Sequence, residues 1–333
     1  MSTLRRKWSA ALATVALAAG MFSAVASPNV FAAAAHRAPA HKKWTIGFVP
    51  GITTDAFYIS MLQGARAEAA KLGVNLDVQG AAQWNYVMQA QIVNDLVTKK
   101  VNLLVIAPND ANAMIPPLKS AVKAGIPVIT VDTTINDPGI LVSRITSNNV
   151  QGGALAAQTL AKMIGYSGDV ALMNVTPGIS TTDQRQQGFL AEIKKFPKIH
   201  VVAVEYTNDQ QSTASNDTEN ILLAHPHLKG VFAMNDVNSG GVAEALKAKG
   251  KSNQVKIVAY DAEPIAVNFL MKNEVQALIV QKPYMEGQMA VLYAYDYLSG
   301  HRKAIVKNVV LANVMADQSN KHNPAITKWY YKS

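Results

Sequence analysis

Short apolar runs rich in β-branched residues alternate along the chain with longer segments in which apolar residues recur at helical spacing. A short apolar run bounded by turn residues is typical of a buried strand, and a 3.6-residue period is typical of a helix covering a sheet. The alternation therefore predicts βαβ units with parallel strands. The first predicted strands cover residues 44–50, 74–79, 102–108, 127–132 and 141–147, with helices between them at about 57–72, 85–99 and 111–124.

The same rhythm starts again after a longer predicted helix at about 149–164. Two sheets suit a chain of 333 residues, which exceeds what one hydrophobic core usually organises. We therefore expect an α/β protein with two open-sheet lobes of similar size. The second set of predicted strands covers residues 169–175, 200–206, 230–236, 255–261 and 275–281.

Polar residues stand at the ends of several predicted strands, which is where open α/β sheets bind their ligands. A single Asp or Asn at such a place is more often a helix cap or a turn former. Four polar residues on equivalent edges instead favour a shared pocket. These four are Asp132, Asp236, Asp261 and Gln281.

The N-terminal stretch has the pattern of an export signal. Basic residues at positions 5–7 precede an uncharged apolar run, and small residues near Ala26 offer a cleavage site. We interpret residues 1–26 as a signal peptide; a membrane anchor is the alternative, since the run approaches the length that spans a bilayer. Residues 27–43, rich in Ala, Pro, His and Lys, are predicted to be a flexible leader.

The composition excludes several classes of protein. Hydrophobic residues make up 49% and charged residues 16% of the chain, which argues against disorder. Without cysteine there is neither a disulfide framework nor a site for N-terminal lipidation. The net charge of +9 is scattered with no basic stripe, which argues against nucleic-acid binding. We expect a periplasmic or secreted protein without a lipid anchor.

Several segments, taken in their order and spacing, resemble the periplasmic sugar-binding proteins of the ribose-binding type over residues 44–320. The resemblance implies two Rossmann-like lobes that close on a sugar, joined by hinge crossings near residues 147–149, 281–283 and 311–313. One lobe would comprise residues 44–147 plus 283–311, and the other residues 148–281 plus 312–333. The segments read AFYISMLQGARAEAAKLG, IPVITVDT, TSNNVQGG, DQRQQGF, LLAHPHLKGVFAMND, VAYDAEP and QALIVQKPYMEG.

The resemblance also implies where a ligand would be held. A sugar ring offers apolar C–H faces to aromatic side chains, and hydroxyls to carboxylates, amides and guanidinium groups. Phe57 and Tyr58 stand where aromatic residues enclose the ring, with the alternative that they begin a helix and pack inward. The residues at positions that would hydrogen-bond the hydroxyls are Asp132, Arg185, Asn235, Asp261 and Gln281.

The chain departs from the ribose-binding pattern at some of these positions. Asp55 replaces an Asn and Thr133 replaces an Arg, and both remain candidate ligand contacts. Ala107 replaces an Asn, Tyr260 replaces a Phe, and one stacking aromatic residue is missing. An unpaired hydroxyl in a dry site is costly, so these changes argue against ribose itself. Trp84, in the loop after the second predicted strand, is a candidate substitute wall for the pocket; the alternative is an exposed loop residue.

The segment STTDQRQQGF also resembles the part of rhamnose- and autoinducer-2-binding relatives that presents an Asp–Gln pair to the ligand. In this chain the pair would be Asp183 and Gln184. The implied ligand is therefore a sugar or deoxysugar, a short polyol, or a furanosyl signal. The alternative for the neighbouring Arg185 is a surface ion pair with Asp183 or Glu192.

No constellation for catalysis stands out, because the nucleophile-elbow, phosphate-loop and dinucleotide motifs are all missing from the sequence. His225 and His227 lie two apart without nearby acidic partners, so we expect neither a metal nor a cofactor.

The implied partners are the small sugar or polyol, an ABC permease and its ATPase, served by a monomeric binding protein. The alternatives are a receptor for a furanosyl signal of the autoinducer-2 type, or one read by a membrane sensor kinase. A ligand-sensing repressor would need a DNA-reading helix-turn-helix where the apolar export segment stands.

Overall fold

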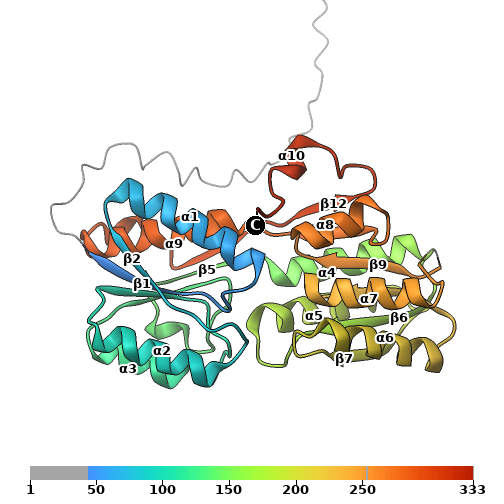
Figure 1. Ribbon diagram of the computed structural model, residues 1–333, viewed down its shortest axis with the longest axis horizontal. Coiled ribbons are helices and arrows are strands. Elements are labelled where there is room, and N and C mark those ends of the chain that lie inside the picture. The colour runs from blue at the N-terminus through green and yellow to red at the C-terminus, as the bar shows by residue number, and fades with distance from the viewer. Residues whose placement is uncertain (1–43, 253, 333) are drawn as a thin grey trace, which may run out of the picture. The chain divides into compact units, whose positions relative to one another are not determined.

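The computed structural model describes residues 44–252 and 254–332, so the predicted signal peptide and leader lie outside the described residues. The described chain forms two lobes, each an open sheet covered by helices (Figure 1), which confirms the predicted α/β fold class. The sheet of the first lobe has the strand order β11-β5-β4-β3-β1-β2, and that of the second β12-β10-β9-β8-β6-β7.

The first lobe packs helices on both faces of its sheet (Figure 1). Helices α1 (Ala56–Leu72) and α9 (Pro283–Leu298) pack against each other on one face, and α2 (Tyr86–Thr98) and α3 (Ile115–Lys123) cover the other. The central strands are buried along their whole length, as expected where both faces are covered. The strands are β1 (Thr45–Val49), β2 (Asn75–Val78), β3 (Leu103–Ile106), β4 (Val128–Val131), β5 (Ser143–Ser147) and β11 (Asn308–Leu311).

The second lobe repeats this plan. Helices α4 (Asn149–Met163) and α5 (Ser180–Ile193) pack together on one face, while α6 (Gln211–Ala224), α7 (Asp236–Ala248) and α8 (Pro264–Met271) cover the other. The strands are β6 (Gly168–Asn174), β7 (Ile199–Tyr206), β8 (Leu228–Ala233), β9 (Lys256–Tyr260), β10 (Ala277–Val280) and β12 (Val314–Asp317).

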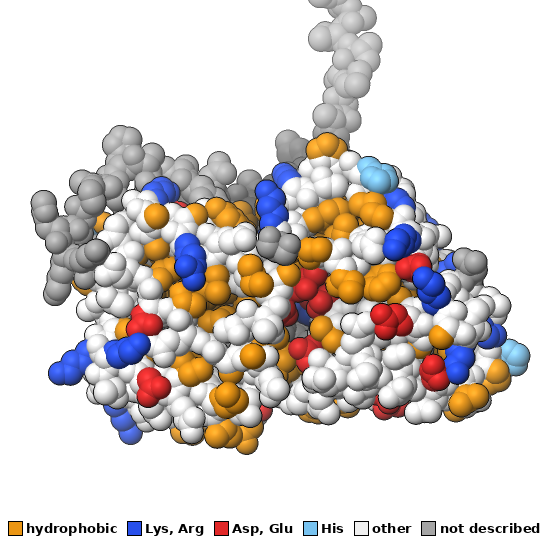
Figure 2. Space-filling model, viewed as in Figure 1, with side chains coloured by type: hydrophobic (Ala, Val, Ile, Leu, Met, Phe, Trp, Pro, Cys, Tyr) orange, Lys and Arg blue, Asp and Glu red, His pale blue; other side chains and the backbone are white. Residues whose placement is uncertain are grey.

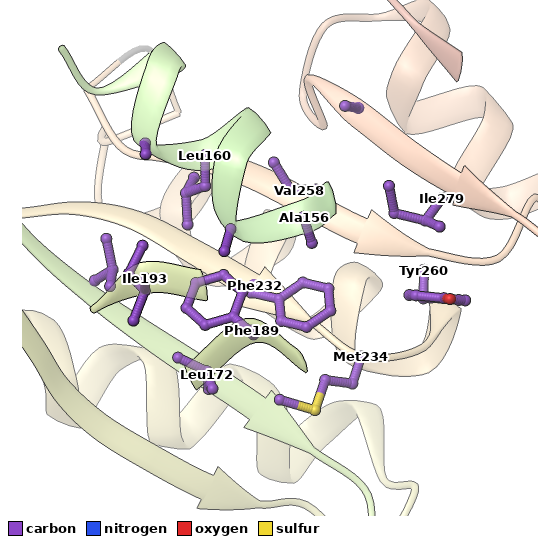
Figure 3. Close-up of a cluster of buried hydrophobic side chains, with 14 of the residues drawn as sticks. Ala156, Leu160, Leu172, Phe189, Ile193, Phe232, Met234, Val258, Tyr260 and Ile279 are labelled. Atoms are coloured by element: carbon purple, nitrogen blue, oxygen red, sulfur yellow. The ribbon is translucent and has the colours of Figure 1, made fainter. Parts of the chain in front are cut away.

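Stacked aromatic rings form the centre of the second lobe's core (Figure 3). Phe189 of α5 lies flat on Phe232 of β8, with ring centroids 5.0 Å apart. Tyr260, the last residue of β9, closes the cluster at the end of the strand, near Met234 (Figure 3). The core therefore extends to the carboxyl edge of the sheet, where it supports the polar residues described below.

The structure differs from the sequence prediction in two places. Strand β12 runs antiparallel to β10, because β11 of the first sheet is followed after two residues by β12, which enters the second sheet from the opposite direction. The helix predicted at 111–124 begins only at Ile115. The preceding residues form a turn in which the Asp110 carboxylate accepts hydrogen bonds from the backbone of Asn112 and Ala113.

No helix in the described ranges is long and apolar enough to cross a membrane.

Candidate functional site

A cavity of about 40 Å³ lies between the carboxyl edges of the two sheets, which is space for a few water molecules. Both lobes contribute to its wall. The sequence-predicted residues that the structure brings together here are Asp55, Phe57, Tyr58, Trp84, Asp132, Arg185, Asn235, Asp261 and Gln281.

Aromatic side chains form the wall on the side of the first lobe. Phe57 and Tyr58 open helix α1 after its cap, and their rings meet edge to face with centroids 5.1 Å apart. The Trp84 ring lies 6.1 Å from that of Tyr58, so the predicted substitute wall does reach the cavity. Both Phe57 and Tyr58 are buried, which means that they pack inward and line the cavity at the same time.

Asp132 lies at the end of β4 with a left-handed backbone (φ 62°), a conformation that Asp tolerates better than most residues. Its Oδ2 accepts a hydrogen bond of 2.5 Å from the Tyr58 hydroxyl. Burial raises the pKa of this carboxyl to about 7, although the Tyr58 bond and the nearby Arg185 charge both favour the ionised form. Asp132 is thus a buried carboxyl that accepts a hydrogen bond within its own lobe and feels the charge of Arg185 from the other lobe.

Arg185 forms the wall on the side of the second lobe. Its guanidinium lies 3.7 Å from the centre of the Tyr260 ring, and its Nε donates to Oδ1 of Asn149 at 2.9 Å. Nη1 donates to the carbonyl of Met234 at 2.6 Å and lies 3.5 Å from Oδ2 of Asp261. The alternative of a surface ion pair is wrong, because the side chain is buried and all these partners belong to its own lobe.

Asp261 and Gln281 stand side by side at the ends of β9 and β10. Gln281 Nε2 donates to Oδ1 of Asp261 at 2.6 Å. Gln281 Oε1 is buried and has no hydrogen-bond partner within the described part of the chain. A buried acceptor of this kind is costly unless a donor reaches it, and it lies in a residue that lines the cavity.

Asn235 combines a structural contact with its place in the cavity wall. Its Oδ1 accepts from the backbone of Asn238 at 3.0 Å and caps α7, while its Nδ2 donates to Asp209 at 2.7 Å. Asn235 is therefore both a helix cap and a residue of the cavity wall.

Three candidates are not among the residues that line the cavity. Thr133 is buried and follows Asp132 directly in the chain. Asp183 is exposed and accepts from the backbone of Gly178 at 3.0 Å, and Gln184 is half-buried. The turn of α5 directs Thr181, Thr182 and Arg185 inward instead, since positions one turn apart share a helix face.

That helical spacing would have identified Thr181 and Thr182 from the sequence, once Arg185 was placed in the pocket. Val175 and Ile179 complete this wall and carry no polar signal. Tyr331, which contacts Asp261, lies beyond the segment that resembles the family, so nothing in the sequence pointed to it.

Carboxylates from both lobes meet beside the cavity, and acidic side chains are visible where the lobes join in Figure 2. Asp55, Asp236 and Glu263 each offer an oxygen within 4.8 Å of the others, a spacing that suits a cation or shared protons. Burial, reinforced by the neighbouring carboxylates, raises the pKa of Asp55 to about 6 and raises those of Asp236 and Glu263 well above the usual range. The cluster borders a larger hollow of about 590 Å³.

Direct contacts hold the lobes together around the cavity. The backbone N–H of Phe57 donates to Glu263 Oε1 at 3.1 Å. On the other side, Thr134 N–H donates to the Ser180 hydroxyl at 2.9 Å, and Ala111 N–H donates to the Gly178 carbonyl at 3.0 Å. These contacts join the two lobes on both sides of the cavity, so the structure shows the lobes closed.

Comparison with known proteins places this geometry in context. The family model described as a periplasmic binding protein domain matches residues 46–302. The chain is 34% identical over 265 residues to the ribose import binding protein RbsB of Escherichia coli, which covers 80% of this chain and 88% of that protein. It is 30% identical over 263 residues to the RbsB of Bacillus subtilis, covering 78% of this chain and 84% of that protein.

Solved structures show the same similarity. An ABC transporter solute-binding protein from Agrobacterium vitis, bound with α-D-tagatopyranose, has a TM-score of 0.85 and 37% identity, covering 87% of this chain and all of that one. A carbohydrate transporter solute-binding protein from Agrobacterium radiobacter, in complex with D-arabinose, has a TM-score of 0.83 and 30% identity, covering 87% of this chain and 99% of that one.

Proposed function

Since the chain belongs to the family of the periplasmic binding protein domain, we propose that it captures a small sugar between its lobes and delivers it to an ABC importer. This family consists of transport binding proteins and not of enzymes. The proposal includes export by the predicted signal peptide and work outside the cytoplasm with a permease and its ATPase.

One observation carries the proposal: the cavity wall combines aromatic side chains with buried charged and amide groups. Phe57, Tyr58 and Trp84 offer apolar surface, and Asp132, Arg185 and Gln281 offer donors and acceptors. Such a combination matches a molecule with C–H faces and a rim of hydroxyls. A sugar hydroxyl that donates to Gln281 Oε1 would satisfy the buried acceptor that the protein leaves unpaired.

Import is favoured over a receptor for a furanosyl signal. The signal reading rested on Asp183 and Gln184, and neither lines the cavity. The relatives named above are import binding proteins, and the solved neighbours named above hold sugars. We expect the lobes to open and close about the segments near 147–149, 281–283 and 311–313, with ligand contacts on both lobes favouring the closed form.

A thermal-shift screen of the mature chain tests the proposal. The panel contains D-ribose, D-tagatose, D-arabinose, D-allose and D-fucose, with amino acids and short peptides as controls. A sugar at 100 times its dissociation constant should stabilise the fold by about 2.7 kcal/mol. Stabilisation by amino acids or peptides alone would overturn the proposal.

A further inference from the structure

The C-terminal segment of the chain returns to the ligand cavity. After β12 the chain forms the short helix α10 (Pro324–Thr327) and then runs back toward the end of β9. There the backbone N–H of Tyr331 donates to the carbonyl of Ala262 at 3.0 Å, and its side chain is 5% exposed. Tyr331 is therefore built into the wall between the cavity and the outer surface.

The Tyr331 hydroxyl holds two residues of the cavity wall at once. It donates to Oδ1 of Asp261 at 2.9 Å and accepts from the backbone N–H of Gln281 at 3.2 Å. The same Oδ1 accepts from the Gln281 side chain, and the other oxygen of Asp261 faces Arg185. The carboxylate is thus fixed by three side chains.

This support matters because of the backbone at Asp261. Its φ of 76° lies in the left-handed region, which Asp tolerates better than most residues but which is still less favourable than the right-handed and extended regions. Surrounding contacts must hold such a conformation in place. Tyr331 supplies one of them from a segment distant in sequence.

The segment also touches the other lobe and the connection between the lobes. The Tyr331 ring lies 5.7 Å from that of Phe57, at the start of α1. Two residues earlier, the Trp329 ring lies 4.9 Å from the ammonium of Lys282, between β10 and α9.

We propose that Tyr331 is a positioning residue for ligand binding. It fixes the carboxylate of Asp261 and the backbone of Gln281, and through Asp261 it orients the side-chain amide of Gln281 that receives the sugar. The inference rests on the proposed function. Side chains that are already fixed lose little conformational entropy when the ligand binds. Because this entropic cost is avoided, the ligand binds more tightly.

The test is Tyr331→Phe, which removes the hydroxyl and keeps the ring against Phe57. By titration calorimetry with the tightest-binding sugar of the panel, we expect about tenfold weaker binding, the effect of one lost hydrogen bond to a charged group. The matched control is Tyr330→Phe, because the Tyr330 hydroxyl donates to the Lys321 carbonyl, away from the cavity. The control should bind as the native chain does.

A double-mutant cycle shows whether Tyr331 acts through Asp261. Combining Tyr331→Phe with Asp261→Asn should weaken binding by clearly less than the product of the two single effects, as expected for residues in one network. If the loss of affinity in the double variant equals the product of the two single losses, Tyr331 does not act through Asp261. Native affinity in Tyr331→Phe would overturn the inference itself.

A measurement without sugar separates this inference from the proposed function. Hydrogen exchange of the backbone N–H of Gln281 should be faster in Tyr331→Phe than in Tyr330→Phe, because Tyr331→Phe removes the hydroxyl that accepts its hydrogen bond. If no sugar of the panel binds the native chain, the proposed function fails. Unchanged exchange at Gln281 would show that Tyr331 does not hold the wall.

Discussion

At the scale of single residues, the site is built around the guanidinium of Arg185, which contacts the carboxylate of Asp261 and has the carboxyl of Asp132 as a further charged neighbour. Arg185 is stacked on Tyr260 and bonded within its own lobe, so opening the lobes would not release it. Asp132 comes from the other lobe and is held by Tyr58. A residue that bonded only to the ligand would face water in an open form and matter little for stability; the contacts of Arg185 within its own lobe rule this out for that residue.

We therefore expect Arg185→Ala to lower both affinity and stability. Losing its hydrogen bonds to the sugar should weaken binding roughly 30- to 150-fold, equivalent to about 2 to 3 kcal/mol. Because Asp261 is left buried without its cation, the free energy of unfolding should fall by about 3 kcal/mol. Calorimetric titration and denaturant unfolding measure the two effects.

Asp132→Asn serves as the contrasting variant. The amide oxygen can still accept from Tyr58, so stability should stay close to that of the native chain, while weaker hydrogen bonds from a neutral acceptor reduce affinity about tenfold. A stable Arg185→Ala variant with weakened binding would show instead that Arg185 contributes only to the ligand.

At the scale of elements, close helix crossings set the position of the binding side chains. In the second lobe, a Cβ at Gly153 of α4 would collide with the backbone carbonyl of Arg185 on α5. In the first lobe, a Cβ at Gly64 of α1 would collide with the carbonyl of Tyr284 on α9. Each lobe thus uses glycine to bring together a helix pair next to the cavity.

Gly153→Ala should push α5 away and move Arg185 from its partners. We expect a loss of stability of about 1 to 3 kcal/mol from overpacking, together with weaker sugar binding. The matched control is Gly240→Ala in α7, where the nearest atom to a new Cβ is the end of the Gln211 side chain at 3.3 Å. Equal melting temperatures for the two variants would contradict this account.

At the scale of the whole molecule, closing the lobes brings Asp55 of the first lobe against Asp236 and Glu263 of the second. Asp209 and Asp261 add further negative charge. Burial, together with this repulsion, raises the pKa values of Asp55 and Glu263, so we expect the closed form to hold protons that an open form would release. A carboxyl whose pKa is raised in the closed form stabilises that form fully at a pH below the ordinary carboxyl pKa. This stabilisation is lost as the pH rises through the raised pKa.

The ligand-free protein should therefore be more compact at pH 5 than at pH 8, with Asp55 beginning to lose its proton near pH 6. The raised pKa of Asp132, about 7, acts in the same direction. Small-angle scattering at the two pH values measures the change in radius of gyration. Glu263→Gln keeps an acceptor for the Phe57 N–H and removes one titrating group, so its response should be smaller. An identical radius at both pH values in the native chain would refute the prediction.

The sequence by itself determined the fold class and most of the strands, because local hydrophobic periodicity reports which faces are buried and each βαβ unit is local in the chain. Its resemblance to a family also indicated most of the residues that the structure gathers in the cavity, from Phe57 to Gln281.

Only the tertiary structure decided which strand-end residues meet. The direction of a side chain depends on helix rotation, which carried Asp183 outward and Thr181 inward. The acidic cluster exists because residues far apart in sequence come together when the lobes close. The same holds for Tyr331, whose contacts with Asp261 and Gln281 span 70 and 50 residues; no local pattern encodes such a contact, since it depends on where the whole chain has folded.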